Sequence, residues 1–403
     1  MRVTILTGLL LACLLAASCT PRADFDSRLS PTVRPYLFDF AGWELNTLRH
    51  EVCQRTPDTH GTDEEVRIVL EYFSAVERTR ALQKRIEAAA SQEKQVDTSA
   101  LESELKNLGE RRRALQDTVE KIIEKQLREA LSEQGIFNPM VRYRVRFPPV
   151  NFRLEQPPYL LVISPRERIE SMREITLRQN LSLEEIQGIE AEADALGVSS
   201  LVVELGGLGA TYPTFVTDTA SLSFTLNTVA EEWLHQYLAF KPLGFLYLLD
   251  LIGLSRNYEI ATINETVASM ASKEIGAAIS QKYYSHSGEN GQPLQEEEPI
   301  FDFNQEMREI RKTVDALLAR GEIEQAEEFM EQKRQHLASK GYYIRKLNQA
   351  YFAFHGTYAD SPTSISPIGV EIRQLRTQSA SLKDFLETAA AITSRQNLKN
   401  IIR

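Results

Sequence analysis

The sequence predicts an α+β protein in which two helical regions flank a small sheet. Apolar residues recur at steps of three, four and seven through residues 61–135, which is typical of amphipathic helices. Short apolar runs bounded by prolines follow between residues 142 and 220, and they indicate strands. From Phe224 onward the pattern is almost entirely helical. The chain has 403 residues, 42% of them hydrophobic and 25% charged, which suits a globular protein with one large or two modest cores.

The first 19 residues resemble a bacterial lipoprotein signal peptide. Arg2 provides the positive end, Val3–Ala17 the apolar core, and Cys19 follows small residues directly. We therefore expect lipidation at Cys19, which would anchor the protein to a membrane on the extracytoplasmic side of a bacterial cell envelope. Ala16 stands where the lipobox usually has leucine. An ordinary signal peptide and an uncleaved anchor are therefore alternatives.

Residues 20–60 contain four prolines and are expected to form a tether that leads into the folded part. Cys53 is then the one cysteine well inside the mature chain, so no intrachain disulfide is expected. The net charge is −10, and lysine and arginine are interleaved with glutamate, which excludes a nucleic-acid partner. The most apolar later stretch, Leu243–Leu254, includes Asp250. We interpret it as a buried helix, with a membrane-touching surface as the alternative.

Residues 61–135 are predicted to form a helical hairpin arm. Capping boxes at Thr62–Glu65 and Ser99–Glu102 each precede a long apolar stripe, and a polar turn lies near residues 91–98. Two such helices joined by a short turn most simply pack antiparallel. The arm is interpreted as a structural spacer, with a partner-binding coiled coil as the alternative.

Residues 136–284 are predicted to hold the sheet and the helices that carry the site. The stretches RYRVRFPPVNFRL, PYLLVISP and SSLVVELGG are typical of strands, and a capping box at Ser182–Glu185 opens a helix through Ala195. The stretch TYPTFVTDTA contains Pro213, which favours an edge strand. The GGLGA run at residues 206–210 predicts a tight turn.

The last third of the chain is predicted to be a flexible loop followed by a helical lobe. Residues 285–299 are rich in Gly, Pro and Glu and are assigned to the loop. The lobe covers residues 300–403, with helices expected at about 303–319, 322–340, 342–355 and 380–401.

The stretch VAEEWLHQYLAF, residues 229–240, contains the candidate chemistry. Residues four apart share one face of a helix, so Glu231 and His235 project together while Glu232 lies beside them. Zinc accepts histidine nitrogen and carboxylate oxygen, and catalytic zinc sites use three protein ligands plus water. Glu265, in the later helical stretch ATINETVASMASKEIG, is the candidate third ligand.

The pattern resembles the gluzincin branch of zinc metallopeptidases, with Glu231 in place of the usual histidine and a longer interval of 29 residues between His235 and Glu265. The resemblance implies a zincin-like small sheet with an active-site helix, and Glu231, His235 and Glu265 as ligands of one divalent metal. It implies Glu232 as the general base that takes a proton from metal-bound water. Zinc is the expected metal, and manganese or iron are alternatives because two of the ligands are carboxylates.

The implied function is that of a membrane-tethered, metal-dependent peptidase acting on a peptide or protein substrate. In such enzymes an edge strand aligns the extended substrate, and the TYPTFVT segment is expected to do so here. The alternative is a catalytically inactive zincin-like lipoprotein that serves as a binding or scaffold protein in the envelope.

The stretch LNQAYFAFHGTYADSP offers donors for a developing oxyanion. Peptidases need such a donor, and His355 and Tyr358 are the candidates. The alternative is an aromatic core helix that ends at Gly356. Glu232 and His235 also match the Glu-x-x-His motif of di-iron bundles, but that fold needs a second copy and the sequence has none. A Gly-x-Ser-x-Gly elbow, a phosphate-binding glycine loop and a Cys-x-x-Cys pair are also absent from the sequence.

Overall fold

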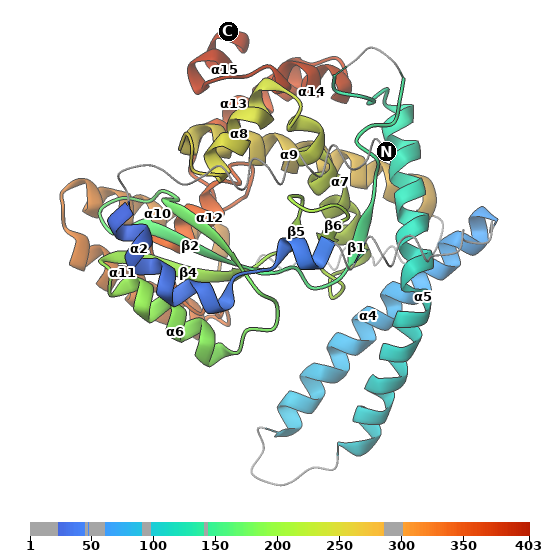
Figure 1. The fold of residues 1–403 in the computed structure, drawn as a ribbon, viewed down its shortest axis with the longest axis horizontal. Helices are drawn as coiled ribbons and strands as arrows, with labels where there is room; N and C mark the ends of the chain where they lie inside the picture. Colours follow the sequence, from blue (N-terminus) through green and yellow to red (C-terminus); the bar gives the residue numbers. More distant parts are fainter. Residues whose placement is uncertain (1–22, 45–46, 48–60, 91–97, 141–143, 286–300) are drawn as a thin grey trace.

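The computed structural model describes residues 23–44, 47, 61–90, 98–140, 144–285 and 301–403. The predicted signal peptide with Cys19, Cys53 and nearly all of the predicted loop at 285–299 lie outside the described residues. Many helices and two three-stranded sheets make up the described part, which confirms the α+β class (Figure 1). None of the helices in these ranges combines the length and the apolar character needed to cross a bilayer.

Two long helices, α4 (Thr62–Ala90) and α5 (Ser99–Glu133), pack against each other and form the arm that projects from the body in Figure 1. The second half of α5 enters the main core, where Ile123 and Leu127 are buried. The predicted capping box at Ser99–Glu102 is not formed at the start of α5, where the N-cap residue makes no side-chain capping hydrogen bond. Thr98 occupies the N-cap position, and its hydroxyl lies 2.6 Å from the Glu102 carboxylate.

The first sheet is antiparallel, in the order β3-β2-β4, with β2 (Tyr159–Pro165) between β3 (Arg173–Leu177) and β4 (Val198–Glu204). Helices α2 (Ala23–Val33) and α6 (Leu183–Asp194) cover one face of this sheet. The predicted capping box at Ser182 is present and starts α6. Residues 23–36, expected to belong to a tether, instead form α2 and the short helix η1 (Arg34–Tyr36).

The second sheet has the order β1-β6-β5, with β1 (Phe152–Leu154) parallel to β6 (Thr214–Val216) and β5 (Gly207–Leu208) antiparallel to it. The TYPTFVT segment was predicted to be an edge strand, but it forms the central strand β6. Pro213 precedes the first paired residue of β6, so its missing N–H interrupts no ladder bond. The edge strands of this sheet are β1 and β5, and β5 lies within the GGLGA run.

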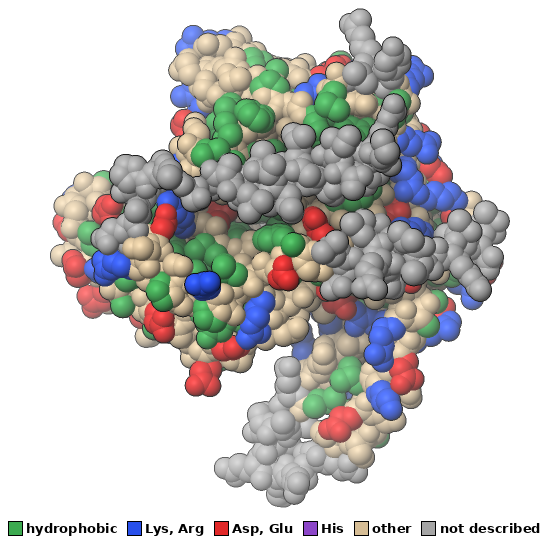
Figure 2. All heavy atoms as spheres, in the orientation of Figure 1, with side chains coloured by type: hydrophobic (Ala, Val, Ile, Leu, Met, Phe, Trp, Pro, Cys, Tyr) green, Lys and Arg blue, Asp and Glu red, His purple; other side chains and the backbone are tan. Residues whose placement is uncertain are grey.

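Three helices follow the sheets: α7 (Leu222–Leu238), α8 (Pro242–Leu251) and α9 (Tyr258–Ile279). α7 and α9 pack closely against each other in the main core. The α8 segment was predicted to be buried, but only one side of it is. Leu243 is fully buried while Phe245 is 55% exposed, and Figure 2 shows apolar side chains at the surface over this region. The five-residue π-helix η2 (Ser280–Tyr284) continues α9.

The C-terminal region is helical but is divided differently from the prediction. Its helices are α10 (Phe303–Ala319), α11 (Ile323–Ser339), α12 (Gln349–Gly356), α13 (Pro367–Gln378), α14 (Leu382–Ala390) and α15 (Arg395–Ile401). The helix expected at 342–355 begins later because the Asn348 side chain caps α12. The helix expected at 380–401 is two helices, since Ser394 caps α15. α12 covers the face of the first sheet opposite α6.

Candidate metal centre

The three predicted ligands converge in the structure. Glu231 and His235 lie one turn apart on α7, and Glu265 reaches them from α9. One nitrogen or oxygen atom of each residue lies within 4.8 Å of those of the other two. The Nε2 atom of His235 is 3.5 Å from the Oε2 atom of Glu265. The side chains of these two residues are 15% and 10% exposed, so the group is nearly enclosed.

The geometry of the three side chains fits a small divalent cation. Zinc bonds of about 2.1 Å in a tetrahedron separate two ligand atoms by about 3.4 Å, close to the distance between His235 and Glu265. Oε1 of Glu231 is buried and accepts no hydrogen bond, whereas Oε2 of Glu265, which also accepts none, has the His235 ring 3.5 Å away. A buried carboxylate oxygen without a partner is costly, and a bound cation would remove that cost.

Asn264 orients the histidine. Its side chain is fully buried, and its Oδ1 atom lies 2.9 Å from Nδ1 of His235. An amide oxygen accepts, so Nδ1 is the donor and carries the proton. In a neutral ring the Nε2 lone pair then faces Glu265 and is available to a metal. We did not assign this role to Asn264 from the sequence, although its position directly before Glu265 was a usable signal.

Two tyrosines hold the third candidate ligand. Tyr247 on α8 donates a hydrogen bond to Oε1 of Glu265, and Tyr358, just after α12, also hydrogen-bonds the Glu265 side chain. Tyr358 was among the predicted site residues. Tyr247 was missed because its helix has the composition of a plain apolar segment.

Glu232 lies beside the three ligand candidates, against the edge strand β5. Its carboxylate accepts a hydrogen bond from the backbone N–H of Gly209. A Cβ atom on Gly207 would stand 2.3 Å from Oε1 of Glu232, so only glycine permits this approach. The sequence predicted only a tight turn for the GGLGA run. In the structure two of its residues form β5, and Gly207 lets this strand approach the Glu232 carboxylate. Burial, reinforced by the charges of Glu231 and Glu265, raises the pKa of Glu232 to about 8.

The carboxylates also determine the charge state of the metal-free site. Burial raises the pKa of Glu231 to about 7. Burial alone would lower the pKa of His235, but the negative charges of Glu265, Glu232 and Glu231 outweigh it and raise that pKa to about 10. Burial opposes ionisation of Glu265, yet His235 and the two tyrosine hydroxyls lower its pKa. Without metal, His235 and Glu265 therefore form an ion pair, and metal binding must release the histidine proton.

His355, the other predicted oxyanion donor, lies apart from this group. Its ring contacts Tyr351 and Phe354, at centroid distances of 4.3 and 5.1 Å, and it lines a separate cavity. Among the described residues, no hydrogen bond joins His355 to Glu231, His235 or Glu265. The structure thus places Tyr358 at the candidate site and His355 outside it.

No known protein family matches this chain, and no curated protein or solved structure shows significant similarity to it. Function is therefore inferred from the chemistry of the site. Two carboxylates and one imidazole converge, a third carboxylate lies beside them, and the histidine and Glu265 are held by further polar side chains.

Proposed function

We propose that this protein is a metal-dependent peptidase that acts on peptide or protein substrates outside the cytoplasm, anchored by a lipid on Cys19. The observation that carries the proposal is the convergence of Glu231, His235 and Glu265, with Glu232 next to them. A divalent cation held by the three residues, zinc first and manganese or iron as alternatives, would polarise the substrate carbonyl and lower the pKa of water.

The surrounding residues have separate roles in this proposal. Glu232 accepts the proton of the attacking water and delivers it to the leaving amine. The single hydroxyl proton of Tyr358, which is donated to Glu265 in the structure, turns to the developing oxyanion. Asn264 and Tyr247 are positioning residues that fix the His235 ring and the Glu265 carboxylate.

The edge strand β5 supports a peptide as substrate. Among the described strands β5 pairs with β6 alone, and its Gly207 lies against the Glu232 carboxylate. An extended peptide added along the other side of β5 would bring its backbone carbonyls close to Glu232, as in other cases of strand addition. The aligning strand is therefore assigned to β5 instead of the TYPTFVT segment.

The test compares two substitutions in the full-length protein supplied with zinc. Glu232→Gln should reduce hydrolysis of a quenched fluorescent peptide library by about 10²–10⁴-fold, because the proton acceptor is lost, while one equivalent of metal stays bound. Glu192→Gln, an exposed residue on α6, is the matched control and should leave the rate unchanged. Hydrolysis by Glu232→Gln at the wild-type rate would contradict the assigned base.

One observation favours the alternative of a catalytically inactive envelope protein. Glu265 is paired with His235, Tyr247 and Tyr358, so protein groups alone satisfy much of the site. A protein that had lost catalysis could keep this network for its stability. The alternative predicts neither bound metal nor hydrolysis after reconstitution with zinc, manganese and iron. Gain of zinc affinity in Glu231→His would then show that the pocket geometry is retained.

A further inference from the structure

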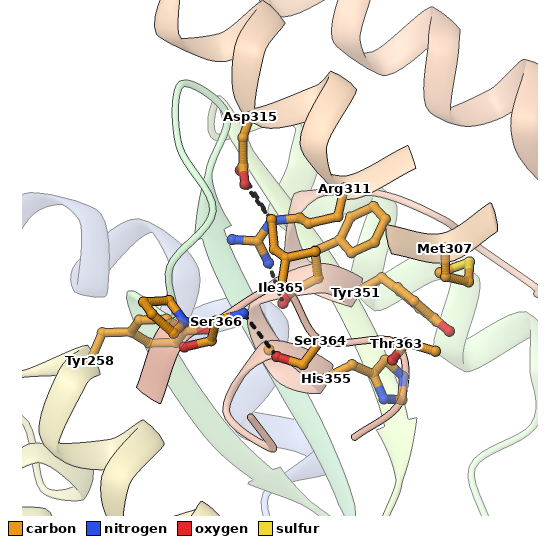
Figure 3. Close-up of a pocket in the computed structure, with 13 residues that line it drawn as sticks. Tyr258, Met307, Arg311, Asp315, Tyr351, His355, Thr363, Ser364, Ile365 and Ser366 are labelled. Atoms are coloured by element: carbon orange, nitrogen blue, oxygen red, sulfur yellow. Dashed lines mark hydrogen bonds and ion pairs between the residues drawn. The ribbon is translucent and has the colours of Figure 1, made fainter. Parts of the chain in front are cut away.

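A cavity of about 250 Å³ opens between α10, α12 and the start of α13, beside the first turn of α9 (Figure 3). Its walls include the aromatic rings of Tyr258, Tyr351 and Phe352. Sites for drug-sized ligands usually measure about 300–1,000 Å³, so this cavity suits a single group of amino-acid size. The aromatic walls favour an apolar or planar body.

Arg311 provides the positive charge in this cavity. Its side chain is 17% exposed, and its Nε atom donates to both carboxylate oxygens of Asp315, at 3.0 Å each. Its Nη1 atom donates to the backbone oxygen of Phe352 at 3.4 Å. A guanidinium carries five N–H donors. Within the described part of the chain no acceptor hydrogen-bonds Nη2, so donors of a partly buried cation are left for a ligand.

Two serines lie across the cavity from the arginine. Figure 3 shows the guanidinium of Arg311 between Asp315 on one side and the segment of Ser364 and Ser366 on the other. Ser364 Oγ accepts a hydrogen bond from the backbone of Ser366, and Ser366 Oγ accepts one from Ile368. Neither hydroxyl donates a hydrogen bond to any described residue. Ser366 is also the N-cap of the 12-residue helix α13, whose positive end favours an anion.

We propose that this cavity binds a carboxylate with an apolar body of amino-acid size. The carboxylate accepts hydrogen bonds from Arg311 and from the hydroxyls of Ser364 and Ser366, and the body lies between the aromatic rings. This site is distinct from the candidate metal centre and does not depend on the proposed peptidase activity. The two sites share the connection between α12 and α13, because Tyr358 contacts Glu265 while both ends of the connection line the cavity.

The ligand could come from two sources, a free carboxylic acid or the carboxyl terminus of a peptide. Three probes distinguish them in calorimetric titrations of the full-length protein: 3-phenylpropanoate, acetyl-Ala-Phe and acetyl-Ala-Phe amide. The proposal predicts that at least one of the two acids binds. If acetyl-Ala-Phe binds, its amide should bind at least about tenfold more weakly, because the amide has no carboxylate. Binding of 3-phenylpropanoate alone identifies a free acid, and binding of acetyl-Ala-Phe identifies a peptide terminus.

Substitutions assign the binding to the cavity. Arg311→Met should weaken binding of the acids at least about tenfold, whereas Arg311→Lys, which keeps the charge without the planar fork, should retain part of it. Lys312→Met is the matched control: Lys312 is 57% exposed, pairs with Glu309, and should not affect binding. If the Arg311→Met protein is unstable, the double variant Arg311→Met/Asp315→Asn replaces it, because it does not leave the Asp315 carboxylate without its partner.

Three results would overturn the proposal. One is absence of binding by both acids at concentrations on the order of 10 mM. Another is equal affinity of the wild-type protein for acetyl-Ala-Phe and its amide, a comparison that needs no variant. The last is wild-type affinity in a folded Arg311→Met protein, with folding checked by circular dichroism.

Discussion

Replacing Asn264 by leucine would remove the hydrogen-bond acceptor that orients His235. Asn264 is fully buried and its Oδ1 atom lies 2.9 Å from Nδ1 of the histidine. Leucine has a similar shape but cannot accept, so the imidazole loses the partner that fixes its tautomer and its ring angle. Once the ring is neutral, its remaining proton then lies on Nε2 in part of the population, and those molecules cannot bind a metal until the proton moves.

The expected magnitude follows from the single contact that is lost. Removing an outer partner of a metal-bound histidine typically weakens metal affinity by about 10–100-fold, which corresponds to about 1.4–2.7 kcal/mol. Asn264→Asp keeps an acceptor at the same position, so its affinity should be at least that of the wild type.

The assay is zinc competition against a chromophoric chelator at fixed pH. Ser272→Ala is the control for buried polar substitutions on α9: Ser272 is fully buried two turns beyond Glu265, and among the described residues its hydroxyl bonds only the Ser269 backbone. It should bind zinc like the wild type. Zinc affinity in a folded Asn264→Leu protein that equals the wild-type value would refute the role of His235 as a ligand through Nε2.

Three further predictions concern the edge strand, the core and the N-terminus. Gly207→Ala places a Cβ atom 2.3 Å from the present position of Oε1 of Glu232, so the carboxylate must shift. The kcat of peptide hydrolysis should fall at least about tenfold, while elemental analysis should still find the bound metal. Burial raises the pKa of Glu120 to about 7, so the folded state holds this proton more tightly than the unfolded state. That stabilisation is complete below about pH 4.5 and is lost as the pH rises through about 7, by about 3 kcal/mol in total. The free energy of unfolding in urea should therefore fall with pH in the wild type and fall less steeply in Glu120→Gln. Cys19→Ser should move the protein from the membrane fraction to the soluble fraction, and an unchanged distribution would exclude the lipid anchor.

The parts of the site that depend on local spacing could be predicted from the sequence. Glu231 and His235 share a face because residues four apart on any helix do so. The contact with Glu265 depends on how α7 and α9 pack, and only the motif resemblance suggested it. Tyr247 could not be found in this way, because nothing in an apolar helix indicates which hydroxyl will meet a carboxylate.

Errors in the predicted elements have local physical causes. His355 and Tyr358 are three residues apart and would share a face if the helix continued, but α12 ends at Gly356 and the chain turns Tyr358 toward Glu265. Strand β3 was missed because its short sequence, REITL, carries two charged residues. Pro213 suggested an edge strand, yet it lies one residue outside the pairing, where it disturbs nothing.

The most direct test of the central claim is the metal content of the purified protein, measured by elemental analysis after reconstitution with zinc, manganese or iron and removal of excess metal. We predict about one equivalent per chain for the wild type. We predict loss of metal in Glu265→Gln and retention in Glu259→Gln, an exposed residue on the same helix. A wild-type protein that stays empty with all three metals, or a Glu265→Gln protein that holds as much metal as the wild type, would contradict the account.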